Sequence, residues 1–226
     1  MHKLLHAWGH NQLTAEEQSK YSQAAFRLVV EAIEGCSRAP DGKLRLVLHV
    51  MGSFAALSGA SDRTNGITED VVDEVAGVGG FMTDVGLWPE TRTSEEYVWQ
   101  ARRRLLGVDD PDTITAMSNL AVTLGQQGCL EEAALMQKEV LVKRQLILGE
   151  DHPDTISAMN NLAVTLGDQG QLDEAAKMKK EVLEKMTRVL GEEHPDTKVA
   201  AQNLAIPVRR QKKRSLLRFL RIKPRK

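Results

Sequence analysis

Apolar side chains recur every three to four residues over 112–125, which predicts a helix with one buried face. The apolar positions of this stripe are Ile114, Met117, Leu120, Ala121 and Leu124. A proline just before the stretch suits a first helical turn, and Gly128 suits the chain reversal after it. A second helix is predicted over 130–148, with its inward positions at Ala133, Ala134, Val140 and Leu141. Together the two segments predict a helical hairpin.

The hairpin pattern returns with a period of 42 residues. Segments 106–147 and 148–189 are identical at 28 of 42 aligned positions, and a third copy opens at Leu190 and breaks off near Pro207. A hairpin of this size cannot bury its own apolar face, so the copies are expected to stack. The sequence therefore predicts an all-α fold built as a helical-hairpin solenoid.

Extending the same register upstream predicts a degenerate copy over 64–105. Gly86 falls where both full copies place the glycine of the chain reversal. The first helix of this copy, predicted over 68–85, contains Gly77, Gly79 and Gly80, each of which weakens a helix by about 1 kcal/mol relative to alanine. Gly79 aligns with an alanine in both full copies, which indicates a close contact between helices.

The chain before this copy does not follow the 42-residue register. Thr14 to Glu17 form a capping-box pattern that opens a predicted helix over 15–34, and a second helix is predicted over 43–58. We interpret them as a pair that caps the stack. The expected divisions are a tail (1–13), the helical pair (14–60), the degenerate repeat (64–105), two full repeats (106–147 and 148–189), a partial repeat (190–206) and a basic tail (207–226).

The net charge of −1 conceals a strong asymmetry. Residues 209–226 contain ten lysines or arginines and no acid, which leaves 20 basic and 31 acidic side chains for the rest of the chain. Three interpretations of this segment stay open. Its basic clusters resemble a nuclear-import or nucleic-acid patch, and its interleaved leucines suit an anionic membrane surface. Alternatively it is a solubilising end, or a cap held by the acidic body.

No stretch is long and apolar enough for a membrane span, and the N-terminus lacks the apolar core of a secretory signal. Cys36 and Cys129 form no motif, and we interpret them as reduced residues of a cytosolic protein. A cytoplasmic location is therefore expected, with nuclear import through the basic tail as the alternative.

No residue set supports catalysis, a cofactor or a metal site, so the chain is not expected to be an enzyme. A phosphate-binding loop pattern is missing, and no nucleophile stands in a recognisable local signature. His2, His6 and His10 share a helical spacing suited to a metal, but a frayed terminus is the preferred interpretation. His152 and His194 recur with the repeat, and we assign them to the turn that starts a helix.

The repeated string LG-x-x-HPDT-x-x-x-x-NLA-x-x-x-x-x-QG-x-x-x-EA resembles tetratricopeptide repeats of the 42-residue, kinesin-light-chain type. Similar repeats occur in the C-terminal sensor arrays of fungal NLR-like STAND proteins. The resemblance is strong over 106–205, weaker over 64–105 and absent from 1–60 and from the tail. It implies a right-handed superhelix whose first helices line a concave groove that binds extended peptides.

The resemblance also implies which residues face that groove. An asparagine repeats at 119, 161 and 203, and its amide suits a peptide backbone because it both donates and accepts hydrogen bonds. The degenerate copy has Gly77 at this position. The expected peptide-binding positions are Ser118, Asn119, Val122, Asn160, Asn161, Val164, Gln202, Asn203 and Ile206. In the alternative, the asparagines bond to the neighbouring hairpin and hold the stack together.

The leading hypothesis is a non-enzymatic scaffold that binds a peptide or protein segment in its groove. One alternative is the repeat part of a STAND-type multidomain sensor that serves assembly, including homo-oligomerisation. The other is nucleic-acid or membrane association through Arg209–Lys226. The sequence does not name the partner.

Overall fold

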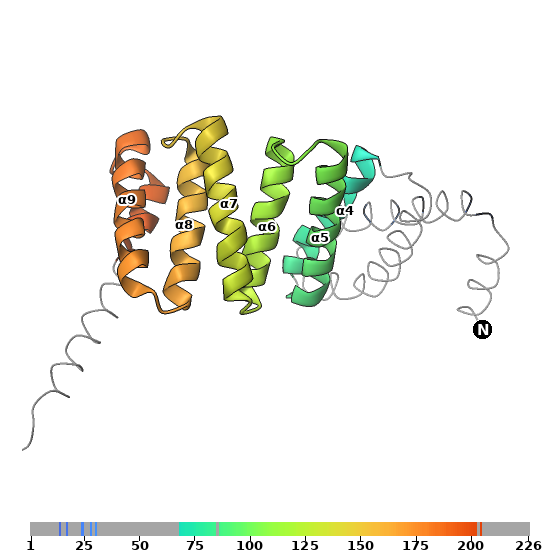
Figure 1. Cartoon of the computed structure of the whole chain (residues 1–226), viewed down its shortest axis with the longest axis horizontal. Coiled ribbons are helices and arrows are strands. Elements are labelled where there is room, and N and C mark those ends of the chain that lie inside the picture. The colour runs from blue at the N-terminus through green and yellow to red at the C-terminus, as the bar shows by residue number, and fades with distance from the viewer. Residues whose placement is uncertain are drawn as a thin grey trace, which may run out of the picture. The chain divides into compact units, whose positions relative to one another are not determined.

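The computed structural model describes residues 68–84, 86–202 and 204, together with the single residues Thr14, Glu17, Ala24, Leu28 and Val30. The described residues form helices and turns and contain no strand (Figure 1). The helices are α4 (Glu69–Asp84), α5 (Trp88–Leu105), α6 (Pro111–Gln126), α7 (Leu130–Leu148), α8 (Pro153–Asp168) and α9 (Leu172–Leu190). Residues 195–202 are helical as well. The predicted all-α fold is confirmed.

The helices begin and end close to where the hydrophobic pattern places them. The helix predicted over 112–125 is α6, and the helix predicted over 130–148 is α7 with the same bounds. All five apolar positions of the predicted stripe in α6 are buried, none of them more than 5% exposed. The apolar period therefore identified the buried face of this helix correctly.

The starts of α6, α8 and the helix at 195–202 are each capped by the residue two positions before an aspartate. Asp110 Oδ1 accepts a hydrogen bond from the Asp112 N–H at 2.8 Å. In the next copy, His152 Nδ1 accepts from the Asp154 N–H at 3.1 Å, and His194 repeats the bond one copy later. This confirms that both histidines belong to the helix-start turn. An imidazole nitrogen here replaces the carboxylate oxygen that more often satisfies a free N–H at a helix start.

The turn between the two helices of each hairpin has one geometry throughout. Gly86, Gly128 and Gly170 have φ between 78° and 83°, a left-handed conformation that favours glycine. The residue after each glycine donates its N–H to a carbonyl five positions back, as Cys129 does to Leu124 at 2.9 Å. These bonds satisfy carbonyls at the helix end that have no partner within the helix. The turn at Gly86 therefore supports the upstream register.

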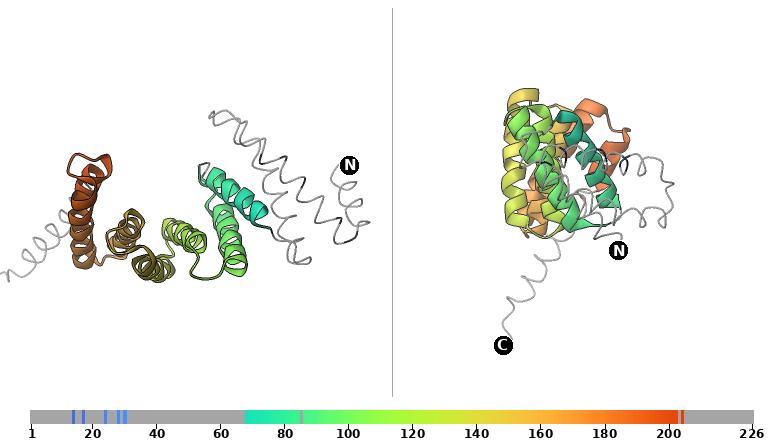
Figure 2. Two further views of the ribbon diagram at one scale, coloured as in Figure 1. Left: turned by 90° about the horizontal axis from the view of Figure 1, so that it is seen from above. Right: turned by 90° about the vertical axis from the view of Figure 1, so that its right-hand side faces the viewer.

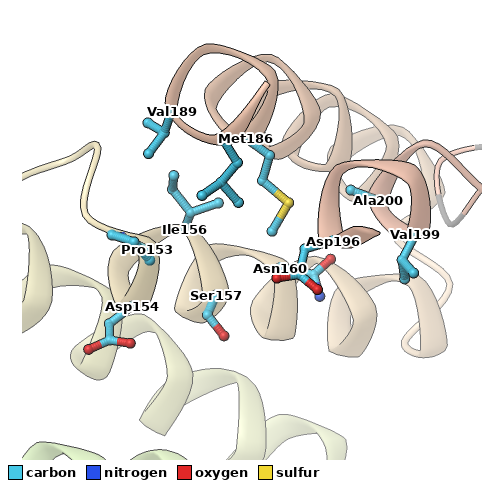
Figure 3. Close-up of a pocket in the computed structure, with 11 residues that line it drawn as sticks. Pro153, Asp154, Ile156, Ser157, Asn160, Met186, Val189, Asp196, Val199 and Ala200 are labelled. Carbon is cyan, nitrogen blue, oxygen red and sulfur yellow. The ribbon is translucent and has the colours of Figure 1, made fainter. Parts of the chain in front are cut away.

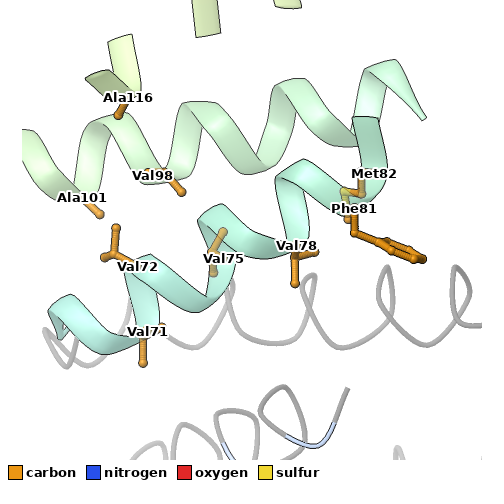
Figure 4. Packing of buried hydrophobic residues seen from close by; sticks show 9 residues of the cluster. All are labelled: Val71, Val72, Val75, Val78, Phe81, Met82, Val98, Ala101 and Ala116. Atoms are coloured by element: carbon orange, nitrogen blue, oxygen red, sulfur yellow. The ribbon is translucent and has the colours of Figure 1, made fainter. Parts of the chain in front are cut away.

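Contacts divide the chain into two units, residues 1–116 and 117–226, which are described separately. In the first unit, α4 packs on α5 through a cluster of buried valines (Figure 4). Val72 and Val75 of α4 lie toward Val98 and Ala101 of α5, and all four are at most 4% exposed. Gly79 is buried on the same helix, as the sequence predicted.

In the second unit, α8 packs against both α7 and α9 (Figures 1 and 2). Small residues bring these helices together: Ala134 of α7 and Ala175 of α9 share one cluster with Leu162 and Leu166 of α8. Gln169 Nε2 also donates to the Leu130 carbonyl at 2.9 Å, which ties the end of α8 to the start of α7. Apolar packing and this bond fix the position of α8 within the unit.

Most of the predicted N-terminal pair, 15–34 and 43–58, lies outside the described residues, as do 1–13 and 207–226. The capping box at its start is described. The Thr14 N–H donates to Glu17 Oε2 at 2.9 Å, and the Glu17 N–H donates back to Thr14 Oγ1 at 3.3 Å. The bond from the Thr14 backbone lowers the pKa of the Glu17 carboxyl. The predicted capping box is confirmed.

The three glycines of α4 are expected to differ when each is replaced by alanine. A Cβ at Gly77 or Gly80 meets no atom within 4 Å, so each change should raise the free energy of unfolding by about 1 kcal/mol. A Cβ at Gly79 would lie 2.6 Å from Ser94 Oγ, a buried hydroxyl that donates to the Thr91 carbonyl. Gly79→Ala should therefore lower the stability, and adding Ser94→Ala should restore it. Urea unfolding of the four full-length variants measures these changes, and equal gains at all three glycines would contradict the packing described.

The helix-start bond at residue 152 is expected to depend on an acceptor and not on histidine itself. His152→Ala should lower the free energy of unfolding by about 1 kcal/mol, because the Asp154 N–H loses its partner. His152→Asp reproduces the cap of Asp110 and should leave the stability near that of the wild type. Thermal unfolding of the two variants makes the comparison, and the cap assignment fails if both destabilise the chain to the same extent.

Candidate peptide-binding cavities

Two cavities of similar size flank α8 in the second unit. The first, here called the α6/α8 cavity, has a volume of about 370 Å³ and lies between the end of α6, α7 and α8. Its lining residues are Val122, Gly125, Gln126, Gly128, Leu130, Gln137, Asn161, Val164, Thr165 and Asp168. The second, the α8/α9 cavity, has a volume of about 410 Å³ and lies between α8, α9 and residues 196–200 (Figure 3).

The structure distributes the predicted peptide-binding residues between these cavities. Asn161, Val122 and Val164 line the α6/α8 cavity, whereas Asn160 lines the α8/α9 cavity, where it lies beside Asp196 (Figure 3). The two adjacent asparagines therefore serve different cavities.

The other predicted positions do not line either cavity. Asn119 and Gln202 are exposed, and Asn203 and Ile206 lie outside the described residues. Ser118 is only 8% exposed, so it offers little surface to a ligand. The reason is its register: Ser118 stands four residues after Ile114 and three before Ala121, on the buried stripe of α6.

The side-chain amides of Asn119 and Asn161 make no hydrogen bond with any described residue. The carbonyl of Asn161 does accept a bond, from the Thr165 hydroxyl at 3.3 Å, but this involves only its backbone. Within the described chain, no side-chain hydrogen bond supports the alternative in which these asparagines hold the stack together. Their donors and acceptors are instead available to a ligand.

Gln137 of α7 also lines the α6/α8 cavity, although it was not among the predicted site residues. It is only 4% exposed, and its Oε1 has no hydrogen-bond partner among the described residues. A buried polar atom without a partner costs about 1–3 kcal/mol, so such an atom in a cavity wall calls for an explanation. The signal was present in the sequence, because a polar residue stands four positions after Ala133 on the inward stripe of α7.

The charged residues that line both cavities are aspartates. Asp168 lines the α6/α8 cavity and makes no ion pair with any described residue. Asp154 and Asp196 line the α8/α9 cavity, each with a histidine Nδ1 within 4 Å of its carboxylate. No lysine or arginine lines either cavity. Their walls therefore favour cationic over anionic groups.

The described residues also bear on two other kinds of site. Among the described residues, no three histidine, cysteine, aspartate or glutamate side chains gather where they could hold a metal ion. None of the described helices is long and apolar enough to cross a membrane. His2, His6, His10, Cys36 and the basic tail lie outside the described residues, so their interpretations stay predictions.

Comparison with known families identifies the repeat. A tetratricopeptide-repeat profile matches residues 112–186 and again residues 154–215, two overlapping spans that begin 42 residues apart. The chain contains tetratricopeptide repeats. The spans cover α6 to α9, which carry both cavities, so the α6/α8 and α8/α9 cavities are features of a tetratricopeptide-repeat array.

Solved structures with a similar fold include repeat proteins. Two are crystal structures of a Podosopora anserina protein that is described as a kinesin light chain with nearly identical TPR-like repeats. Each alignment covers 90% of this chain and 94% of the other chain. Their TM-scores are 0.64 and 0.62, at 18% sequence identity. BtubC (BKLC) from P. vanneervenii has a TM-score of 0.51 at 16% identity and covers 95% of this chain and 96% of its own. No curated protein matches the chain.

Replacing Gln137 tests whether the buried acceptor in the wall of the α6/α8 cavity lowers the free energy of unfolding. Gln137→Leu should raise the free energy of unfolding by about 1 kcal/mol, because it removes a buried acceptor that has no partner and keeps most of the side-chain volume. Chemical unfolding of the full-length variant provides the measurement. A loss of stability instead would show that the amide supports the fold.

Proposed function

We propose that the tetratricopeptide repeats of this chain bind an extended peptide or protein segment along α6 and α8 of the second unit. Tetratricopeptide repeats generally mediate protein–protein interaction and act as non-enzymatic scaffolds. The observation that carries the proposal for this chain is the pair of amides at Asn119 and Asn161. They stand one repeat apart on first helices, have no hydrogen-bond partner among the described residues, and one of them lines a cavity.

The chemistry of these positions suits a peptide backbone. An extended segment presents N–H and C=O groups that have no partner of their own, and an asparagine amide can donate to one and accept from the other. Val122 and Val164 lie near these amides in sequence and are 37% and 42% exposed, so they add apolar contact for the side chains of the segment. Backbone bonds supply affinity in such complexes, and pockets for side chains supply selectivity.

The binding surface of the described chain is small. Two asparagines and two cavities within the second unit limit the number of contacts that a segment can make. We therefore expect a dissociation constant of about micromolar magnitude, which corresponds to about 8 kcal/mol of binding free energy. An affinity of this order suits a reversible scaffold.

Replacing both asparagines tests the proposal. The double variant Asn119→Ala/Asn161→Ala should bind more weakly to a nine-residue peptide that the full-length chain selects from random sequences. The affinity should fall tenfold or more, because two hydrogen bonds of about 1 kcal/mol each are lost. Fluorescence anisotropy measures the affinity, and circular dichroism checks that the helix content is unchanged.

A matched control separates the site from the surface in general. Gln100→Ala removes an exposed amide of α5 that lines neither cavity, and it should leave the affinity unchanged. The proposal would be refuted by a double variant that folds and binds the peptide as well as the wild type does.

A further inference from the structure

We infer that the bound segment places a lysine or arginine side chain in the α6/α8 cavity. This inference rests on the proposed function and specifies the ligand of the same site. Three features of the cavity wall carry it: a carboxylate without a counter-charge, a buried acceptor without a donor, and two exposed valines beside them.

The charge of the cavity favours a cation. Asp168 is exposed at the end of α8, and no ion pair with a described residue compensates its carboxylate. The walls contain no lysine or arginine. A bound acidic side chain would therefore meet a like charge, whereas a lysine or arginine would gain a partner.

Gln137 supplies an observation independent of the charge. Its side chain is buried, it lines the cavity from α7, and its Oε1 lacks a donor among the described residues. Lysine and arginine side chains only donate hydrogen bonds, so either supplies the kind of group that this acceptor lacks. An ionised aspartate or glutamate only accepts, and it would leave Oε1 without a partner.

The apolar part of the wall fits the same class of side chain. Val122 and Val164 are 37% and 42% exposed and line the cavity from α6 and α8. Lysine and arginine lay their aliphatic stems along such surface while the charged head reaches polar groups. A volume of about 370 Å³ is near the lower end for ligand pockets, which suits one long side chain better than a whole small molecule.

The second cavity extends the charge pattern along α8. Asp154 and Asp196 line the α8/α9 cavity, again without a lysine or arginine in the wall. Asp154 stands at the start of α8 and Asp168 at its end, so a segment lying along α8 passes both carboxylates. The partner that this surface fits is thus an extended, lysine- or arginine-bearing segment of a separate protein.

A peptide selection tests the inference. Random nine-residue peptides displayed on beads are selected with the full-length chain, and the selected sequences are counted. The wild type should enrich lysine and arginine over aspartate and glutamate. Asp168→Asn should lower this enrichment about threefold, the range for an exposed ion pair, and higher salt should lower it as well. Gln137→Leu should reduce it too.

Two further chains serve as controls. Glu181→Gln removes one exposed carboxylate of α9 that lines neither cavity, and it should leave the enrichment unchanged. A full-length chain with all ten lysines and arginines of 209–226 changed to Gln removes peptide selection by the basic tail itself, and it should give the same preference as the wild type.

The outcomes separate the inference from the proposed function. Peptide binding without a preference for lysine or arginine, or with a preference that Asp168→Asn leaves unchanged, overturns the inference and leaves the function standing. If neither the wild type nor the variant with the changed tail selects any peptide, the proposed function is overturned as well. A preference that emerges only after the tail is neutralised identifies the chain's own tail as the occupant, and it overturns the assignment to a separate protein.

Discussion

The geometry of this chain depends on a left-handed glycine at the end of every described helix from α4 to α9. These glycines stand at 86, 107, 128, 149, 170 and 191, which is one every 21 residues. Each helix and its turn therefore occupy half of the 42-residue repeat. Because most residues with a Cβ avoid this conformation, the glycines fix where the chain reverses. Within the second unit, the positions of α7, α8 and α9 follow from these reversals, and the two cavities follow from those positions.

The frame of the repeat is the same in the two full copies, whereas two polar residues of the α6/α8 cavity differ between them. The apolar stripe, the turn glycines and the HPDT segment stay the same in the two full copies, apart from Asp110 in place of His152. Residues of the α6/α8 cavity differ between copies: Gln126 aligns with Asp168, and Gln137 aligns with Lys179. The charge and hydrogen-bonding capacity of the cavity thus come from positions that the fold leaves free to vary.

Features decided by neighbouring residues in sequence could be predicted, and features decided by packing could not. The bounds of α6 and α7, the turn at Gly128 and the helix-start role of His152 follow from local propensities and hydrogen bonds. Ser118 was wrongly expected at an open surface, because burial at the edge of a stripe depends on the neighbouring helix. Lys185 shows the same limit: it is only 8% exposed, with Nζ held 3.3 Å from Glu150 and 3.4 Å from Asp151. The cavities were not foreseen either, since a cavity is a property of three helices together.

The most direct measurement of the central claim is where a bound segment touches the chain. Val164 and Val142 offer a matched pair, because both are exposed valines on helices of the second unit, and only Val164 lines a cavity. A photo-reactive benzoylphenylalanine at each position, irradiated with a labelled peptide selected by the full-length chain, reports contact by cross-linking. The account predicts a cross-link from position 164 and none above background from position 142. A cross-link from position 142 without one from position 164 would contradict it.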